Sequence, residues 1–463
     1  MEQLHHGAVP GQRPATRPFP VADTSGADAA ARLLRRGEQA LYVTGRLTDS
    51  RQHFRAAYLA AESAGQPQGM ARAALGLGGI WVAEHRSAAA AADARMRQQN
   101  ALHRVGANTA LGRRLSVRLA AESDYRCGES TAVSTAMRAI ADDDPAGLAE
   151  AISLTHHCLL GPDHVHRRLD LAAALLGVAA RTGRRFDVLM GLYWRTVDLM
   201  LAADPHAGRS LAELRAALQQ TGHLALRYAG SALDVMLAIR SGGFDRAERL
   251  ADDCAALGVQ AGDQDTTGWH GAQLAAIRWY QGRMGEMVPL LADTVDSPTL
   301  SEVDDAYPAA LAVAAAAAGD RRRAECALAR LGSRLFALPR SSSWLVTLVG
   351  VVEAADALGD RDIAAAAYDL LLPFADLPMM ASLAVACFGS TQHALGVASL
   401  TLGQADRAVA HLRTAVQANE ALGHWPAAVL SQHRLTQALL ARRGPDDAPA
   451  ATELAARVQA EAL

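Results

Sequence analysis

Four histidines and one cysteine lie close together between residues 155 and 167. They are His156, His157, Cys158, His164 and His166. Because imidazole and thiolate groups bind zinc, this composition suits a zinc site. The dipeptide Gly161-Pro162 separates the two histidine pairs, however, and favours a loop followed by a helix that Asp163 caps. We prefer this second interpretation, and we expect neither a metal nor a cofactor.

Aspartates gather at three places along the chain. The segment Asp263-Gln264-Asp265-Thr266-Thr267 resembles the aspartate motif with which terpene cyclases protonate alkenes, and 142–144 and 304–305 resemble carboxylate clusters that bind a metal and a diphosphate. A carboxylic acid in an apolar cavity can act as a general acid if its pKa is raised. Each cluster falls where a turn between helices is expected, and an aspartate before a helix is ordinarily an N-cap. We therefore expect N-caps, with acid catalysis as the alternative.

All 45 basic residues are arginine, because the chain contains no lysine. A Walker phosphate loop and Schiff-base catalysis both need a lysine, so these two chemistries are excluded. No Ser-His-Asp order, glycine-rich dinucleotide fingerprint or paired-cysteine metal site stands out. An active site assembled from separated parts of the chain would escape this search.

Net charge and cysteine usage indicate which kinds of partner and which cell compartment suit the chain. The formal charge of −3 lacks the excess of positive charge that is typical of a nucleic-acid binder. The five cysteines are odd in number and form no close pair, which suits a reducing compartment. Residues 1–26 carry four prolines and lack the order of a secretory signal, so they predict a disordered leader on a cytoplasmic protein.

The composition predicts helices for the rest of the chain. Half of the residues are hydrophobic but only 5% are aromatic, and alanine runs such as 88–92 and 312–318 suit close helix packing. β-branched residues are too scattered to predict strands. The segment 377–404 has no charged residue and is long enough to cross a bilayer, but its polar groups would be costly in lipid. We expect a buried helix there.

One stretch spaces small and apolar residues as a helix-turn-helix repeat does. Its members are Leu395, Gly396, Ser399, Gly403, Ala408, Leu412 and Ala415. This stretch resembles one tetratricopeptide repeat, although Ser399 replaces the usual tyrosine and no proline closes the unit at Glu420. Similar turn glycines recur upstream, and with Gly403 they are spaced 40, 37, 40 and 44 residues apart: Gly242, Gly282, Gly319 and Gly359.

These turns predict an all-α, tetratricopeptide-like superhelix, or α-solenoid, over residues 27–463. In such a scaffold each repeat touches only its neighbours, so stability is a sum of neighbouring interfaces. One elongated body is therefore expected.

A second resemblance covers roughly residues 27–445. The segments 164–170, 194–201, 338–345 and 370–374 and the last repeat are similar to the C-terminal helical-repeat region of large actinobacterial ATP-binding regulators of the LuxR type. In those regulators the repeat region senses a ligand or partner, while other domains hydrolyse ATP and bind DNA. Neither of those domains has a counterpart here. The resemblance implies the scaffold and the recognition role, without transcriptional activity.

Projecting the repeat phase onto the sequence places a set of aromatic and charged residues along the concave groove, where such scaffolds usually bind. The set is Trp194, Asp198, Trp269, Trp279, Glu353, Asp356, His393 and Arg434, with His270 and Arg278 beside the tryptophans. Large spacers packed between repeats are the alternative role for the tryptophans. Trp269 and Trp279 lie ten residues apart and are expected to border one groove.

The sequence thus predicts a standalone sensor or adaptor in a regulatory or specialised-metabolite pathway. Its partner would be a small molecule, a peptide, another protein or a second copy of the chain, and neither nucleic acid nor a membrane. The alternative is an unconventional enzyme, such as a cyclase or hydrolase, that uses the groove as its active site. A closed aromatic pocket with converging ionisable groups would favour a small molecule or catalysis, and an open polar groove would favour a peptide or protein.

Overall fold

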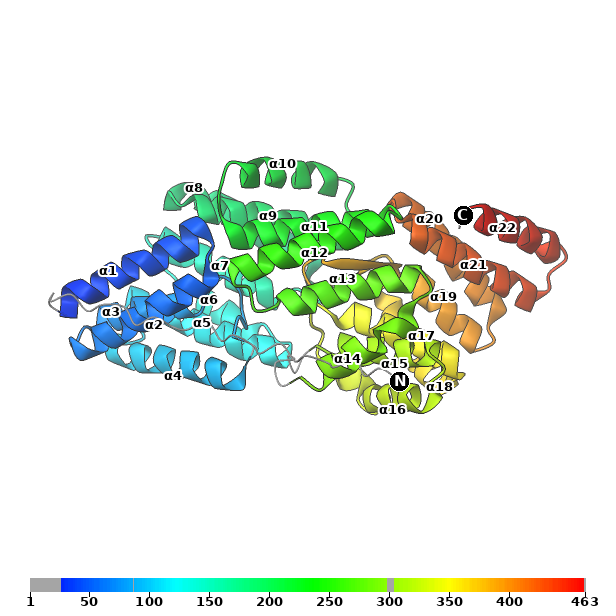
Figure 1. Ribbon diagram of the computed structural model, residues 1–463, viewed down its shortest axis with the longest axis horizontal. Coiled ribbons are helices and arrows are strands. Elements are labelled where there is room, and N and C mark those ends of the chain that lie inside the picture. The colour runs from blue at the N-terminus through cyan, green and yellow to red at the C-terminus, as the bar shows by residue number, and fades with distance from the viewer. Residues whose placement is uncertain (1–25, 86, 298–303, 462–463) are drawn as a thin grey trace, which may run out of the picture.

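The computed structural model describes residues 26–85, 87–297 and 304–461, and these form an all-α protein with one small hairpin (Figure 1). The α-helices are α1 Gly26–Gln39, α2 Leu47–Ser63, α3 Pro67–Leu77, α4 Ala88–Val105, α5 Ala110–Cys127, α6 Thr131–Met137, α7 Pro145–Cys158, α8 Val165–Thr182, α9 Arg185–Leu201, α10 Ala207–Gln219, α11 Leu224–Arg240, α12 Phe244–Ala261, α13 Thr266–Tyr280, α14 Val288–Val295, α15 Ala306–Ala317, α16 Arg321–Gly332, α17 Trp344–Leu358, α18 Arg361–Leu371, α19 Thr391–Thr401, α20 Ala405–Ala421, α21 Trp425–Arg442 and α22 Asp447–Glu461. A π-helical turn, η1, spans Ala40–Thr44, and short 3₁₀ turns are η2 Pro162–His164, η3 Met284–Met287, η4 Leu335–Ala337 and η5 Leu372–Phe374.

The start of many helices is fixed by a side-chain cap. Ser87, Thr109, Asp144, Asp320 and Asp360 each accept a hydrogen bond from a backbone N–H in the first turn of the following helix. Such caps satisfy donors that the helix itself leaves without a partner, and each contributes about 1 kcal/mol.

The five predicted turn glycines all connect helices. Their φ angles lie between +69° and +80°, a region that side chains other than hydrogen rarely adopt: Gly242, Gly282, Gly319, Gly359 and Gly403. The last of them joins α19 to α20, and Gly396 of α19 lies so close to α20 that a Cβ atom there would be 2.5 Å from Leu412 Cγ. The predicted helix pair is therefore present, with the small residue at its closest approach.

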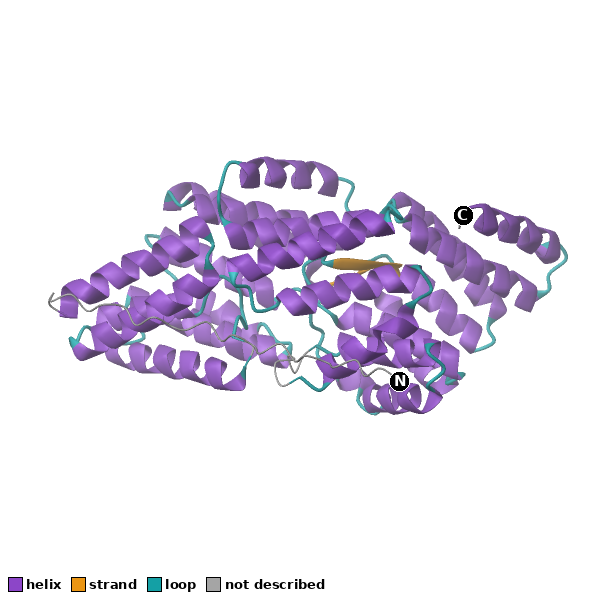
Figure 2. Ribbon diagram, viewed as in Figure 1, coloured by secondary structure: helices purple, strands orange, loops and turns teal. Residues whose placement is uncertain are grey.

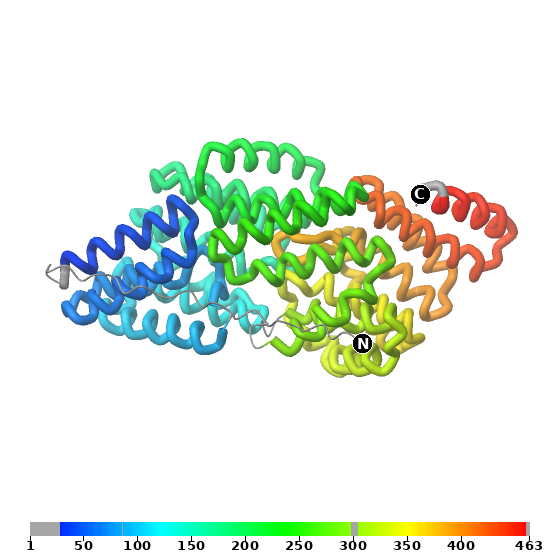
Figure 3. Tube along the Cα trace, in the orientation of Figure 1, coloured from blue at the N-terminus to red at the C-terminus, as the bar shows by residue number. Residues whose placement is uncertain are grey.

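Consecutive helices pack on one another along most of the chain. The first helices lie at one end of an elongated body and α20–α22 lie at the other, as the chain trace in Figure 3 shows. Helices far apart in sequence meet as well, since α21 contacts both α11 and α13. A simple row of repeats has no such contacts.

The β-hairpin explains these distant contacts. Strand β1 (Pro378–Ala381) pairs antiparallel with β2 (Ala386–Ser390), with Met380 opposite Cys387. Helices surround the two strands (Figure 2). β1 contacts α9 and α17, and β2 contacts α11, α13, α20 and α21. Met379, Ala384 and Cys387 are 0% exposed, so the hairpin is part of the core.

This hairpin corrects two predictions. The uncharged segment 377–404 is not one buried helix, because its first half forms strands and only Thr391–Thr401 is helical. Strands are therefore present in a chain for which none was expected. In the described part of the chain, no helix has the length and apolar character needed to cross a bilayer. The proposed leader lies outside the described residues except for Gly26, which begins α1.

Candidate functional site

The hairpin borders a recessed cavity of about 90 Å³, which we name the hairpin cavity. Its wall is mostly apolar and is formed by α13, α14, α15, α17 and the hairpin: Gly268, Trp269, Gly271, Ala272, Ala275, Leu291, Ala306, Ala310, Val346, Ala381, Val385 and Phe388. Polar groups are fewer and come from Tyr125, Asp265, Asp304, Tyr307, Ser341, Ser342, Ser343 and Ser382. The backbone N–H of Ser382 donates to the Ser342 carbonyl at 3.2 Å and so fixes the hairpin tip over the cavity.

Trp269 is held rigidly in this wall. Its indole stacks on Tyr228 with 4.8 Å between ring centroids, and its Nε1 donates to Asp265 Oδ2 at 3.1 Å. Asp265 stands at the N-cap position of α13 but makes no capping bond. The N-cap interpretation is thus right for Asp144, which accepts from the Gly147 N–H at 2.8 Å, and wrong for the side chain of Asp265. That carboxylate lines the cavity instead.

A smaller chamber of about 30 Å³ adjoins the hairpin cavity and shares the side chains of Tyr125, Asp265, Trp269 and Ser382 with it. Its other walls are Trp81, Val82, Ala83, Glu84, His157, Asp263, Gln264 and Leu383. The Trp81 ring contacts the rings of His157, Tyr193 and Trp194 at centroid distances of 6.0, 5.9 and 5.8 Å. The two spaces therefore lie along a nearly continuous aromatic surface. The part of this surface that Trp81 forms was not predicted from the sequence.

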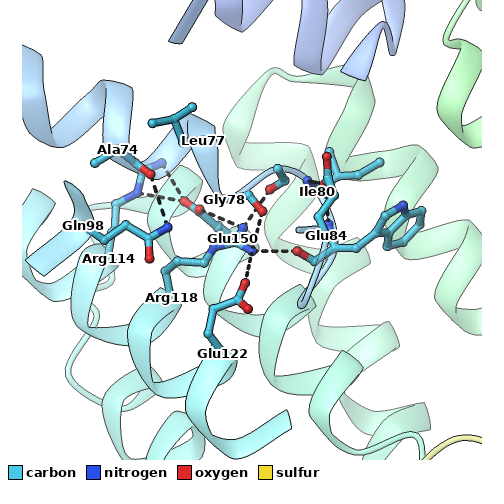
Figure 4. A network of polar contacts seen from close by, with 12 residues as sticks. Ala74, Leu77, Gly78, Ile80, Glu84, Gln98, Arg114, Arg118, Glu122 and Glu150 are labelled. Atoms are coloured by element: carbon cyan, nitrogen blue, oxygen red, sulfur yellow. Dashed lines mark hydrogen bonds and ion pairs between the residues drawn. The ribbon is translucent and has the colours of Figure 1, made fainter. Parts of the chain in front are cut away.

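A buried arginine holds the loop that carries Trp81 (Figure 4). Arg118 is 1% exposed, and its guanidinium donates to the carbonyls of Gly78, Gly79 and Trp81 at 3.1, 2.8 and 2.8 Å. Glu84 closes the loop from the other side, because its Oε2 accepts from the Ile80 N–H at 2.9 Å. Such bonds to a charged group are strong, and they keep Trp81 at the chamber.

Two carboxylates next to Arg118 titrate differently. Burial raises the pKa of Glu122, against the opposing charge of Arg118. Burial would also raise the pKa of Glu150, but the charges of Arg114 and Arg118 outweigh it and lower that pKa. Of the two carboxyl groups, Glu122 is therefore the weaker acid.

Trp194 and Asp198 of α9 lie behind the aromatic surface and are fully buried. Asp198 accepts from Arg168 Nε at 2.8 Å and faces His156 Nε2 at 2.7 Å. Trp194 Nε1 donates to Ser153 Oγ at 2.9 Å. All these groups are bonded within the protein, so the structure places them as supports of the interior rather than on a free surface.

Four further predicted residues meet in a separate cluster between α17, α19 and α21. Arg434 joins two carboxylates, because its guanidinium lies 2.9 Å from Glu353 Oε2 and 2.9 Å from Asp356 Oδ2. His393 lies 3.3 Å from Glu353 Oε1 and contacts Ser431 Oγ at 2.9 Å. Burial would raise the pKa of Glu353, but the bond from His393 and the charge of Arg434 lower it overall.

The remaining predicted residues do not reach the hairpin cavity. His270 contacts Asp252 at 3.1 Å, and Arg278 bonds to Glu248, so both side chains face α12. Trp279 is half-buried and packs against the core cluster to which α15 and α17 contribute. Trp279 therefore does not line the hairpin cavity with Trp269.

Across residues 26–85, 87–297 and 304–461, no three His, Cys, Asp or Glu side chains come together as a metal site. Of the clustered histidines, His156 faces Asp198 and His157 packs against Tyr125 and Trp194. His164 precedes α8 and His166 lies in its first turn. The predicted loop and helix start are present there, but Asp163 does not cap the helix: His164 stands at the N-cap position without a side-chain bond, and the Asp163 carboxylate pairs with Arg340 at 2.6 Å.

Comparison with protein-family models gives no match to this chain, and comparison with curated proteins gives no significant match. The fold is all-α on the evidence of the structure itself. The resemblance to tetratricopeptide repeats and to LuxR-type regulators stays a prediction from the sequence.

Proposed function

We propose that the protein is a sensor or adaptor that binds one small, largely apolar molecule in the hairpin cavity. The observation that supports this most is the cavity between Trp269 and the hairpin tip, where apolar side chains surround a few hydroxyl and carboxylate groups. Ligand sites commonly have this composition. The hairpin also takes up the interior that an extended peptide would need, which favours a small molecule over a peptide or protein in this place.

The volume limits the size of the ligand. An enclosed apolar cavity of about 150 Å³ holds one benzene molecule. The hairpin cavity of about 90 Å³ and its side chamber of about 30 Å³ are both smaller than this, so they suit a molecule smaller than benzene, such as a short branched chain with one polar group. The serines at 341–343 and Ser382 provide hydrogen-bond partners for one polar substituent.

An enzyme is the second candidate, and Asp265 supports it. Its side chain lines both spaces beside Trp269 instead of capping α13. A carboxyl group next to an aromatic wall can protonate a bound substrate and the ring can stabilise the cation that forms. A binding protein would release its ligand unchanged, and an enzyme would not.

The test uses 1-fluoro-2-propanol, a short branched alcohol that is smaller than benzene, as a probe, with binding followed by fluorine NMR. Trp269→Ala should weaken binding by about 1–3 kcal/mol, as the loss of an aromatic hot spot does. Trp279→Ala is the matched control on the same helix and should leave affinity unchanged. Equal loss in both variants, or no binding to the unmodified protein, would refute the assignment.

Native mass spectrometry of the protein from its producing cells then separates the two candidates. A ligand retained unchanged by both the unmodified protein and Asp265→Asn supports a sensor. Conversion by the unmodified protein that stops in Asp265→Asn supports the enzyme.

A further inference from the structure

A larger cleft lies away from the hairpin cavity and shares none of its lining residues. It has a volume of about 810 Å³ and runs between the N-terminal helices, the start of α9 and the turn before α11. We name it the π-turn cleft, after η1 in its wall. Its volume falls in the range of pockets that hold drug-sized molecules, roughly 300–1,000 Å³.

The π-helical turn Ala40–Thr44 shapes one side of this cleft. Such turns are rare and often occur at functional sites. Here the wide turn places Tyr42 and Val43 in the wall, and Val43 is 62% exposed. His223 stabilises the turn, because its ring Nε2 contacts the Leu41 carbonyl at 2.9 Å. Gly45 ends it with a φ of +65°, where a Cβ atom would lie 2.5 Å from His223.

The floor of the cleft is apolar. Phe54, Leu75, Phe186 and Leu189 line it and are buried against the core. Tyr42 meets Phe186 edge-on with 5.3 Å between centroids. An apolar chain or ring would lose water contacts on this floor, which stabilises binding in proportion to the area covered.

The rim is rich in arginine: Arg72, Arg114, Arg184 and Arg185. Three of the four have carboxylate partners, which are Glu38, Glu150 and Asp187 respectively. The fourth, Arg185, donates to the neutral Gln220 amide oxygen at 2.7 Å. Four positive charges thus face three negative charges, and the surplus charge is at Arg185.

Tyr42 adds a neutral donor. Burial, together with the charge of Glu150, raises its pKa to about 12, so the hydroxyl keeps its proton at neutral pH. Arg184 lies over its ring, with the guanidinium carbon 4.9 Å from the centroid.

We propose that the π-turn cleft binds a monoanion with an apolar body, such as a carboxylate on an aliphatic chain or a ring. Arg185 supplies the charge that the carboxylate requires, Tyr42 supplies a hydroxyl donor, and the floor of Phe54, Leu75 and Leu189 covers the body. This site is separate from the hairpin cavity, so either assignment can fail without the other.

The experiment measures binding of dodecanoate by calorimetry, below its micelle concentration, with dodecyltrimethylammonium as a ligand of the same body and opposite charge. Dodecanoate should bind at least about tenfold more tightly than the cation, because only the anion gains a charge-assisted bond. Arg185→Gln should weaken dodecanoate binding about tenfold. Arg195→Gln on the same helix, which leaves the cleft lining intact, should not.

A second variant tests the same site without touching the buried floor. Val43→Glu places a negative charge on an exposed position of the wall and should also weaken dodecanoate binding about tenfold. Leu59→Glu, another exposed apolar position outside the cleft, is its control. Circular dichroism checks that all four variants are folded. Equal affinity for the two ligands, or equal effects of a variant and its control, would overturn the proposal.

Discussion

Gly271 lies on the wall of the hairpin cavity in the middle of α13, and replacing it by alanine tests whether that space is open. A Cβ atom built at this position meets nothing within 4 Å, although the residue is buried. The added methyl group should therefore enter the cavity without displacing a neighbour. We expect Gly271→Ala to stabilise the protein.

Two contributions set the size of this effect. Alanine is favoured over glycine inside a helix by about 1 kcal/mol. Burial of one methyl group adds about 0.8 kcal/mol. Gly271→Ala should thus raise the free energy of unfolding by roughly 1.5–2 kcal/mol. Gly177 in α8 is the matched control, because its Cβ would also be unobstructed but the residue is exposed, so Gly177→Ala should give only the helix contribution.

Urea unfolding followed by circular dichroism measures both variants. Gly271→Leu should in addition abolish 1-fluoro-2-propanol binding, because its side chain fills the space, whereas Gly177→Leu should not. If Gly271→Ala is no more stable than Gly177→Ala, the cavity is not the empty apolar space described above.

Asp198→Ala should lower stability by about 3–5 kcal/mol, because a buried arginine loses its carboxylate, whereas Asp234→Ala breaks an exposed pair and should cost less than about 1 kcal/mol in the same urea assay. Burial lowers the pKa of His223 and of His424 to about 4, from the usual 6.5. The unfolded chain therefore binds protons first, and stability should be complete above pH 6.5 and fall toward pH 4, by up to roughly 3 kcal/mol per histidine. His424→Gln should reduce that slope in unfolding measured across this pH range. Arg118→Met should leave three loop carbonyls without their donor and speed hydrogen exchange around Trp81.

The helices and their turns were predictable because they depend on local signals. Gly242 through Gly403 need a positive φ to end one helix and begin the next, and the alanine runs restrict the chain to close helix packing. The hairpin was not predictable in the same way. Its residues form a continuous apolar run. Such a run has the same pattern in a buried strand as in a buried helix, so periodicity cannot distinguish the two.

The candidate site was predictable only in part. The residue types of Trp269, Asp263 and Asp265 made them candidates from the sequence. Trp269 and Asp265 line the hairpin cavity, and Asp263 lines the side chamber. Tyr125, Ser341 and Ser382 were not assigned to a site, because they reach the cavity from segments far apart in the sequence. Trp279 was placed by repeat phase alone, and phase does not tell which neighbour a side chain meets once the hairpin fills the interior.

The hairpin also sets the order in which the protein can complete its fold. Helices α9, α11 and α13 leave the ribosome well before residues 378–390, yet the strands complete their inner faces. The early helices must therefore keep an unfinished apolar wall until the hairpin arrives, and a chain that stops before residue 378 would expose that wall to aggregation. Because the hairpin contacts helices that are far apart in sequence, the N-terminal and C-terminal helices should unfold together in a single cooperative transition. In an array of independent repeats, by contrast, the repeats unfold one after another.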